Sequence, residues 1–285
     1  MFSQGDGIAV SIPGEVADRE DRHLTKNWPD SLTPSNRLLN RDDPPPVIVT
    51  NPGGSSPLLL LGDHAGRAIP GALAGLGVPP EALDLHIAWD IGVAGLGGCL
   101  AAALDACFIH QAYSRLVIDC NRRPETPGAM PTVSDGVAIP GNADLSVEAR
   151  AARCEAIYDP YQARIAQDLD ARERRGQQTL LVSLHSFTPQ MDGIVRPWRF
   201  GVLHRGDSPF SQRVLGLLQA ELGELAGDNR PYAMDAIDNT IPLHADPRRL
   251  DYLELEVRQD LIADAAGQDE VAAFLGRLLA EATAP

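Results

Sequence analysis

Two short apolar runs that each end in a histidine constrain the fold of this chain more than any other feature. Leu58–Leu61 leads into His64, and Leu180–Leu184, interrupted by one serine, leads directly into His185. Apolar runs of this length are typical of strands buried on both faces of a parallel sheet. Ligands collect where the carboxyl ends of such strands meet, so we expect His64 and His185 at one sheet edge although more than a hundred residues separate them. The pattern predicts a metal site or a catalytic pair there.

Helix-sized and strand-sized segments alternate through most of the chain, which indicates one α/β domain. The 285 residues, 44% of them hydrophobic, suffice for a substantial core. Strands are predicted at residues 47–50, 58–61, 108–113, 116–119, 180–185, 199–204 and 252–258, and helices at 79–104, 146–176, 209–225 and 268–282. The first of these helices would carry Asp90 near its middle.

The amino-terminal segment differs in composition from the rest of the chain. Residues 1–45 are polar, charged and rich in proline, which disfavours regular structure. We expect an extended arm there and place the folded domain at residues 46–285. The amino terminus lacks the basic and apolar regions of a signal peptide, and no stretch approaches eighteen uninterrupted apolar residues. The sequence therefore predicts neither export nor membrane insertion.

The charge and the cysteines restrict the partners and the compartment. A net charge of -15 would repel nucleic acid and anionic lipid over most of the surface, so we expect neither as a partner. The four cysteines show no C-x-x-C pairing, and three of them lie in apolar or helical contexts that suit buried free thiols, which is typical of a reducing, cytoplasmic protein. The oligomeric state stays open, a homo-oligomer included.

Two histidines at strand ends suit zinc, whose catalytic sites take three protein ligands and leave the fourth position for water or substrate. Asp90 is the candidate for the third ligand, because an acidic residue within the apolar stretch 85–92 is costly to bury unless a charged partner or a metal compensates it. Asp63 is the alternative. It would point away from His64 in extended backbone, but a turn there could redirect it. A hydrogen-bonded structural role would also explain each residue taken alone.

A metal hydrolase also needs a base that takes a proton from water and returns it to the leaving group, and a carboxylate commonly serves. Glu256 fits, because it lies near the polar end of the strand predicted over 252–258. Glu254, Glu256 and Arg258 share one face of that strand. The alternative is a solvent-facing stripe in which these three side chains pair with one another.

Arginines form the third group of candidate residues. They are Arg115, Arg122 and Arg123 after Asn121, and Arg196, each close to the end of an apolar run. Because the guanidinium fork matches a carboxylate with two hydrogen bonds, they predict a small carboxylate-bearing substrate. Surface ion pairs are the alternative for at least one of them.

The residues that carry this chemistry fall into six ordered blocks: Asp63–Pro70, Tyr113–Arg122, Leu184–Pro189, Arg196–Trp198, Asp228–Tyr232 and Glu256–Leu261. Together, over about residues 47–280, they resemble the N-formylglutamate amidohydrolase family. The resemblance implies a single α/β domain with a mixed, largely parallel sheet flanked by helices, similar to the carboxypeptidase-like zinc hydrolases. It also implies cleavage of a formyl or small acyl group from an acidic amino acid such as N-formyl-L-glutamate, which would yield formate and glutamate.

One position departs from the carboxypeptidase-like pattern. In those enzymes a glutamate ligand commonly follows the first histidine by three residues, whereas Arg67 stands at that position here. The resemblance therefore places His64, His185 and Glu256 in matching blocks but does not decide the third ligand.

The resulting hypothesis is hydrolysis of an N-acyl amino acid by one divalent metal, Zn²⁺. The assigned residues are His64, Asp90 and His185 for the metal, Glu256, Arg115 and His244 for catalysis, and Asn121, Arg122, Arg196 and Ser186 for substrate binding. Two alternatives are kept: a zinc amidase for peptidoglycan fragments or another N-acyl compound, and a non-catalytic carboxylate-binding relative.

Overall fold

A computed structural model of the chain describes residues 38–234 and 236–284. Most of the arm expected at residues 1–45 lies outside these ranges, so its boundary stays a prediction. Within the described part, Leu38 and Leu39 pack against the core, and the Tyr113 hydroxyl donates a hydrogen bond to the carbonyl of Pro44 at 2.6 Å.

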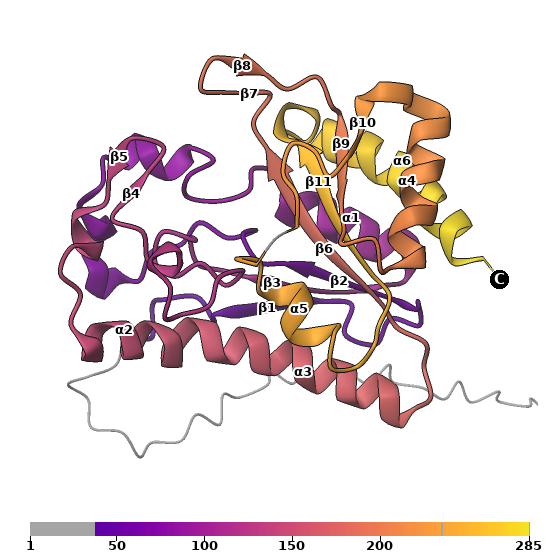
Figure 1. Ribbon diagram of the computed structural model, residues 1–285. Coiled ribbons are helices and arrows are strands. Elements are labelled where there is room, and N and C mark those ends of the chain that lie inside the picture. The colour runs from indigo at the N-terminus through magenta and orange to yellow at the C-terminus, as the bar shows by residue number, and fades with distance from the viewer. Residues whose placement is uncertain (1–37, 235, 285) are drawn as a thin grey trace, which may run out of the picture. The chain divides into compact units, whose positions relative to one another are not determined.

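The centre of the domain is a seven-stranded sheet with strand order β1-β3-β2-β6-β11-β9-β10 (Figure 1). Its strands are β1 (Val47–Thr50), β2 (Leu58–Gly62), β3 (Cys107–Gln111), β6 (Leu180–Phe187), β9 (Phe200–Leu203), β10 (Ala226–Asp228) and β11 (Tyr252–Arg258). The four consecutive strands β3, β2, β6 and β11 are parallel. β1 pairs antiparallel with β3 and β9 pairs antiparallel with β11, whereas β10 runs parallel to β9. The parallel centre brings the carboxyl ends of four strands to one edge.

Helices cover both faces of the sheet. They are α1 (Val93–Leu104), α2 (Val147–Arg153), α3 (Asp159–Arg174), α4 (Pro209–Leu222), α5 (Thr240–His244) and α6 (Ala265–Thr283). One core joins α1, α4 and α6 to one face of the sheet, and a second core joins α3 to the other (Figure 1). The expected α/β class with a largely parallel sheet flanked by helices is confirmed.

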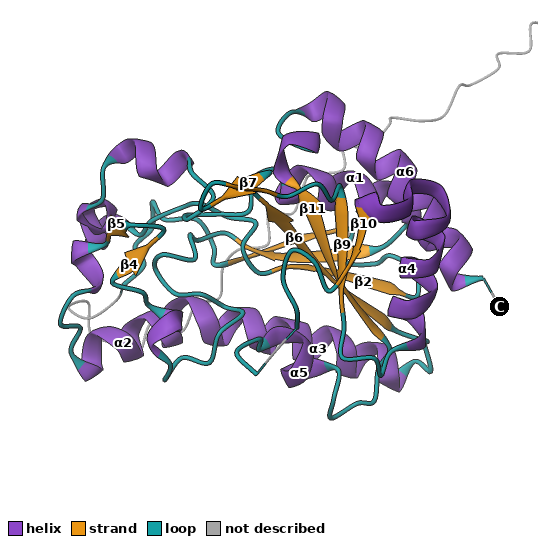
Figure 2. Cartoon of the chain, turned by 45° about the horizontal axis from the view of Figure 1, so that its top comes forward, coloured by secondary structure: helices purple, strands orange, loops and turns teal. Residues whose placement is uncertain are grey.

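Loops and short elements fill the edge at the carboxyl ends of the parallel strands (Figure 2). Two hairpins lie among them: β4 (Val133–Ser134) with β5 (Val137–Ala138), and β7 (Gln190–Met191) with β8 (Ile194–Val195). Short 3₁₀-helical elements lie at Gly71–Gly77, Pro80–Asp84, Pro127–Ala129, Pro140–Asn142, Gly223–Leu225 and Gln259–Leu261, and a π-helical turn at Cys154–Tyr158 joins α2 to α3.

Two secondary-structure predictions were wrong. The single helix expected over 79–104 is instead a short 3₁₀ helix at Pro80–Asp84 followed, after a turn, by α1. Gly92 adopts φ 85°, a left-handed conformation that interrupts a right-handed helix. Asp90 therefore lies in a turn before α1. The strand expected over 116–119 is a series of turns, since the preceding Ser114 side chain accepts a hydrogen bond from the Leu116 backbone N–H at 3.1 Å.

In the described part of the chain, all four cysteines are free, and no helix is long and apolar enough to cross a membrane. Cys107 and Cys120 are buried, whereas Cys99 and Cys154 are partly exposed.

Gly92 is the backbone position on which the placement of Asp90 depends. A Cβ there would lie 2.1 Å from the Ile262 carbonyl oxygen, and φ is positive as well. We expect Gly92→Ala to destabilise the fold by about 2 kcal/mol or more. Gly98→Ala, in α1 with nothing within 4 Å of the added Cβ, is the matched control and should be neutral or stabilising. Thermal unfolding of the two variants measures the difference, and equal melting temperatures would contradict this account.

Candidate metal centre

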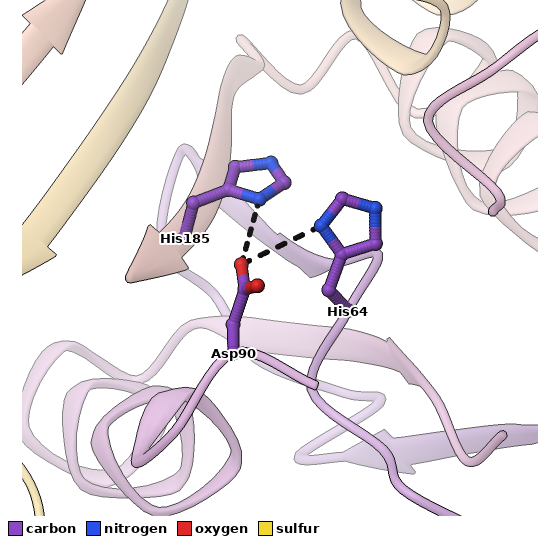
Figure 3. Close-up of side chains that lie close together, drawn as sticks. All are labelled: His64, Asp90 and His185. Atoms are coloured by element: carbon purple, nitrogen blue, oxygen red, sulfur yellow. Dashed lines mark hydrogen bonds and ion pairs between the residues drawn. The ribbon is translucent and has the colours of Figure 1, made fainter. Parts of the chain in front are cut away.

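The carboxylate of Asp90 lies between the imidazoles of His64 and His185 (Figure 3). Its Oδ2 is 3.0 Å from His185 Nδ1 and 3.5 Å from His64 Nδ1. All three side chains are buried, and each offers a ligand atom within 4.8 Å of the other two. Two imidazoles and one carboxylate are a donor set of catalytic zinc sites.

Three separate parts of the fold position these donors. His64 follows β2 by two residues, His185 lies near the carboxyl end of the neighbouring strand β6, and Asp90 lies in the turn before α1. The Asp90 backbone N–H donates to the His64 carbonyl at 2.8 Å, which joins the turn to the end of β2. The Ser186 backbone N–H donates to Asp90 Oδ2 at 3.2 Å.

The far nitrogen of each imidazole has its own acceptor. His64 Nε2 lies 2.7 Å from Asp119 Oδ1, and His185 Nε2 lies 3.0 Å from the Ser183 hydroxyl and 3.6 Å from Asp63 Oδ2. Metal-binding histidines commonly donate their second N–H to such groups, which fixes the tautomer and the ring orientation. Both rings thus keep Nδ1 for the side of Asp90.

An unpartnered ring nitrogen also supports a metal at this position. His64 Nδ1 is buried and has no hydrogen-bond partner, and buried polar atoms are rarely left in that state. Asp63, the alternative third ligand, instead accepts hydrogen bonds from Ser183 at 3.1 Å and Thr240 at 2.7 Å. It therefore faces the back of His185, and Asp90 occupies the position between the rings.

The pKa values of all three donor side chains are shifted by their neighbours. Burial opposes the charged form of His185, but two carboxylates outweigh it and raise its pKa well above the ordinary value. Burial and the charge of Arg115 also oppose the imidazolium of His64, yet Asp119 and Asp90 raise its pKa. Burial would raise the pKa of Asp90, but the two imidazoles hold it far below its usual range. A metal would replace the imidazolium protons, so binding should release protons.

Two glutamates from β11 lie beside this centre. Glu254 and Glu256 are 3% and 6% exposed, and the Oε2 atom of each is buried without a hydrogen-bond partner. Burial raises the pKa of Glu254 to about 8 and that of Glu256 to about 7. The alternative of a solvent-facing paired stripe is wrong, since Arg258 pairs with Asp260 at 2.7 Å instead.

The centre opens into a pocket of about 490 Å³, within the range of small-molecule sites. Arg115 and Arg122 line it together with Asn121, Ser186 and Glu256. The structure thus gathers most of the predicted substrate-contacting residues around the predicted metal ligands.

Two predicted residues are not among those that line the pocket. His244, in α5, is buried outside the pocket lining and accepts or donates a 2.7 Å hydrogen bond with Gln162, and burial lowers its pKa to about 4. Arg196 does not line the pocket itself, but it donates to the hydroxyls of Thr188 and Tyr232, which do.

Sequence reasoning missed several residues that the structure places at the site. Asp119 orients His64, Ser183 contacts His185, and Glu254, Thr188 and Tyr232 line the pocket. For Glu254 and Ser183 a signal existed, because each lies two residues before a predicted site residue on the same strand face. Asp119 and Tyr232 lie in loops, where no periodicity identifies the residues that reach a site.

Comparisons with known proteins agree with this geometry. The sequence model of the N-formylglutamate amidohydrolase family matches residues 56–263. The crystal structure of gene product Atu2144 from Agrobacterium tumefaciens is similar, with 35% identity, a TM-score of 0.83, and coverage of 86% of this chain and 98% of that one. N-formylglutamate amidohydrolase from Ralstonia eutropha JMP134 is similar in fold, with 21% identity, a TM-score of 0.60, and coverage of 84% and 96%. No curated protein sequence matches the chain.

The contact between Asp119 and His64 predicts a measurable effect on metal affinity. Asp119→Asn keeps the shape of the side chain but removes its charge, and loss of such a partner typically weakens metal binding about 10- to 100-fold. Competition with a chromophoric chelator measures the dissociation constant for zinc. Asp170→Asn, which removes an exposed partner of Arg248, is the control. Equal affinities in both variants would show that Asp119 does not support a metal ligand.

The buried carboxyl of Glu254 predicts a pH-dependent stability. Its pKa rises from 4.5 to about 8 on folding, so the folded state binds the proton more tightly and is destabilised as pH rises through this interval, by about 1.4 kcal/mol per pKa unit. In metal-free protein, Glu254→Gln should leave the melting temperature unchanged near pH 4.5 and raise it increasingly toward pH 9. The exposed Glu270→Gln serves as the control. A difference from wild type that is constant with pH would contradict the burial of an ionisable Glu254.

Proposed function

The chain belongs to the N-formylglutamate amidohydrolase family, and we propose on that basis that it is a metal-dependent hydrolase of the amide bond of N-formyl or other small N-acyl amino acids. The observation that carries this proposal is the buried Glu256 beside a cluster of two imidazoles and one carboxylate. A binding protein would have no need of a buried base at that position.

His64, Asp90 and His185 would hold the metal, and their donor types favour zinc. When bound, zinc supplies a Lewis acid that polarises the amide carbonyl and lowers the pKa of water. The orphaned His64 Nδ1 and the acceptors behind both rings support this assignment.

Glu256 serves as the proton carrier in this proposal. The sheet register places it opposite His185 on the neighbouring strand, and both lie at the edge that opens into the pocket. Its pKa of about 7 suits a group that must both accept and return a proton near neutral pH. Glu256 takes a proton from water and delivers it to the leaving nitrogen.

Arg115 is assigned to the negative charge that develops on the carbonyl oxygen. It lines the pocket and is fixed by Asp119, which accepts from Nε at 3.1 Å and from Nη2 at 2.7 Å. A fixed positive charge requires little reorganisation during the reaction, which is the basis of electrostatic transition-state stabilisation. Asn121, Arg122 and Ser186 line the same pocket and are assigned to substrate binding; no catalytic role is proposed for His244.

The expectations of a cytoplasmic location and of partners limited to small carboxylates stay predictions. They agree with the net charge of -15 and with the free cysteines.

Glu256→Gln tests the assigned base. General acid–base catalysis contributes about 10²- to 10⁴-fold, so kcat for release of formate from N-formyl amino acids should fall by that factor. The variant should still bind one zinc per chain, because Glu256 is not among the three donors. Full activity in this variant would refute the base, and wild-type protein that binds zinc but hydrolyses no N-acyl amino acid would favour the non-catalytic alternative.

A further inference from the structure

The pocket holds more acidic than basic groups, although the family's substrate has two carboxylates. The acidic lining residues are Asp90, Asp119, Asp135, Asp238, Glu254 and Glu256. The arginines among the lining residues are Arg115 and Arg122. The charge of the substrate that fits this pocket therefore depends on which nearby guanidinium groups are free to bind a substrate carboxylate.

Both lining arginines are already paired with carboxylates. Arg115 is bound through two nitrogens to Asp119 and lies 3.5 Å from Asp90. Arg122 Nη1 lies 3.1 Å from Asp238 Oδ1 and also donates to the Asn121 carbonyl at 2.8 Å. A substrate carboxylate could reach Arg122 only in competition with Asp238.

Arg196 is different, because its partners in the described part of the chain are neutral. It donates to the hydroxyls of Thr188 at 3.2 Å and Tyr232 at 2.9 Å and to the sulfur of Met191 at 2.9 Å. Its guanidinium lies 4.8 Å from the centre of the Tyr232 ring. Among the described residues, no carboxylate lies within 4.0 Å of it. Thr188, Met191 and Tyr232 all line the pocket, so a carboxylate bound there can extend toward Arg196.

The rest of the pocket wall does not favour a second anion. Ile87, Leu116, Met191 and Ile237 contribute apolar surface to the lining, and Ile237 is 55% exposed. Asp238 also lines the pocket, and its carboxylate would repel a second substrate carboxylate that approaches Arg122. A neutral, apolar group can instead pack against this wall.

We propose that the substrate is a monoanionic N-acyl amino acid, whose single carboxylate binds at Arg196 and Thr188 and whose side chain is neutral. This inference rests on the proposed function and narrows it, since it excludes an acidic side chain such as that of glutamate. Asp238 determines the specificity because it pairs with Arg122, so that Arg122 contacts a neutral part of the substrate and binds no second carboxylate.

Three N-formyl substrates of similar length test the proposal with the zinc-loaded full chain. N-formyl-L-glutamine and N-formyl-L-methionine should each show a kcat/KM at least tenfold higher than N-formyl-L-glutamate, which differs from the glutamine compound by one charge. Equal or better hydrolysis of N-formyl-L-glutamate would overturn the proposal.

Two variants test the roles assigned to Asp238 and Arg196. Asp238→Asn keeps an acceptor for Asn121 but releases Arg122, so the preference for glutamine over glutamate should fall at least fivefold; an unchanged preference would overturn the role of Asp238. Arg196→Gln should raise KM for all three substrates about tenfold with a smaller change in kcat, and an unchanged KM would overturn the carboxylate site.

Measuring substrate affinity without turnover distinguishes a failure of the proposed specificity from a failure of the proposed hydrolysis. Calorimetry with zinc-loaded Glu256→Gln measures the affinity for each compound without turnover. If N-formyl-L-glutamine binds more tightly than N-formyl-L-glutamate while the wild type hydrolyses neither, the specificity is supported and the proposed hydrolysis fails. Tighter binding of N-formyl-L-glutamate would overturn the specificity, whatever the activity.

Discussion

The pairing of Asp90 with two buried imidazoles is the interaction on which the rest of the site depends. An ionised carboxylate is costly to bury unless it is paired and hydrogen-bonded. Here the imidazoles of His64 and His185 lie 3.5 and 3.0 Å from the carboxylate, and the Ser186 backbone supplies a hydrogen bond. Gly92 makes the turn that presents this carboxylate, so local backbone geometry and site electrostatics are coupled.

The parallel centre of the sheet explains how residues far apart in sequence come to lie together. β2 and β6 are neighbours and end at the same edge, which places His64 near His185. β11 is the next strand, and its register sets Glu256 opposite His185. The proposed base and metal ligand are therefore neighbours through backbone hydrogen bonding, and loops contribute Asp90 and Arg115. This agrees with the general placement of α/β sites at the carboxyl ends of strands.

The strands whose residues follow a regular hydrophobic pattern could be predicted from the sequence. The apolar runs before His64 and His185 predicted buried strands and a shared edge, and the period of two along β11 placed Glu254 and Glu256 on one face. Asp90 was predicted as the third ligand because burying its charge is costly, although the helix predicted around it was wrong.

The supporting contacts could not be predicted, because they depend on how loops fold over the sheet edge. Asp119 reaches His64 from a turn fifty-five residues later in the chain, and Tyr232 meets Arg196 from a loop after β10. Neither position carries a periodic signal. The ion pair of Arg122 with Asp238 likewise spans 116 residues, so sequence alone treated Arg122 and Arg196 as equivalent carboxylate binders.

Zinc binding by the two histidines and Asp90 is tested most directly by anomalous scattering from crystals of the full chain grown with one equivalent of zinc. We expect a single strong peak between the side chains of His64, Asp90 and His185, with Asp119 and Asp63 behind the rings and not bound to the metal. A peak at Asp63 or Glu254, or no stoichiometric peak at this edge of the sheet, would contradict it.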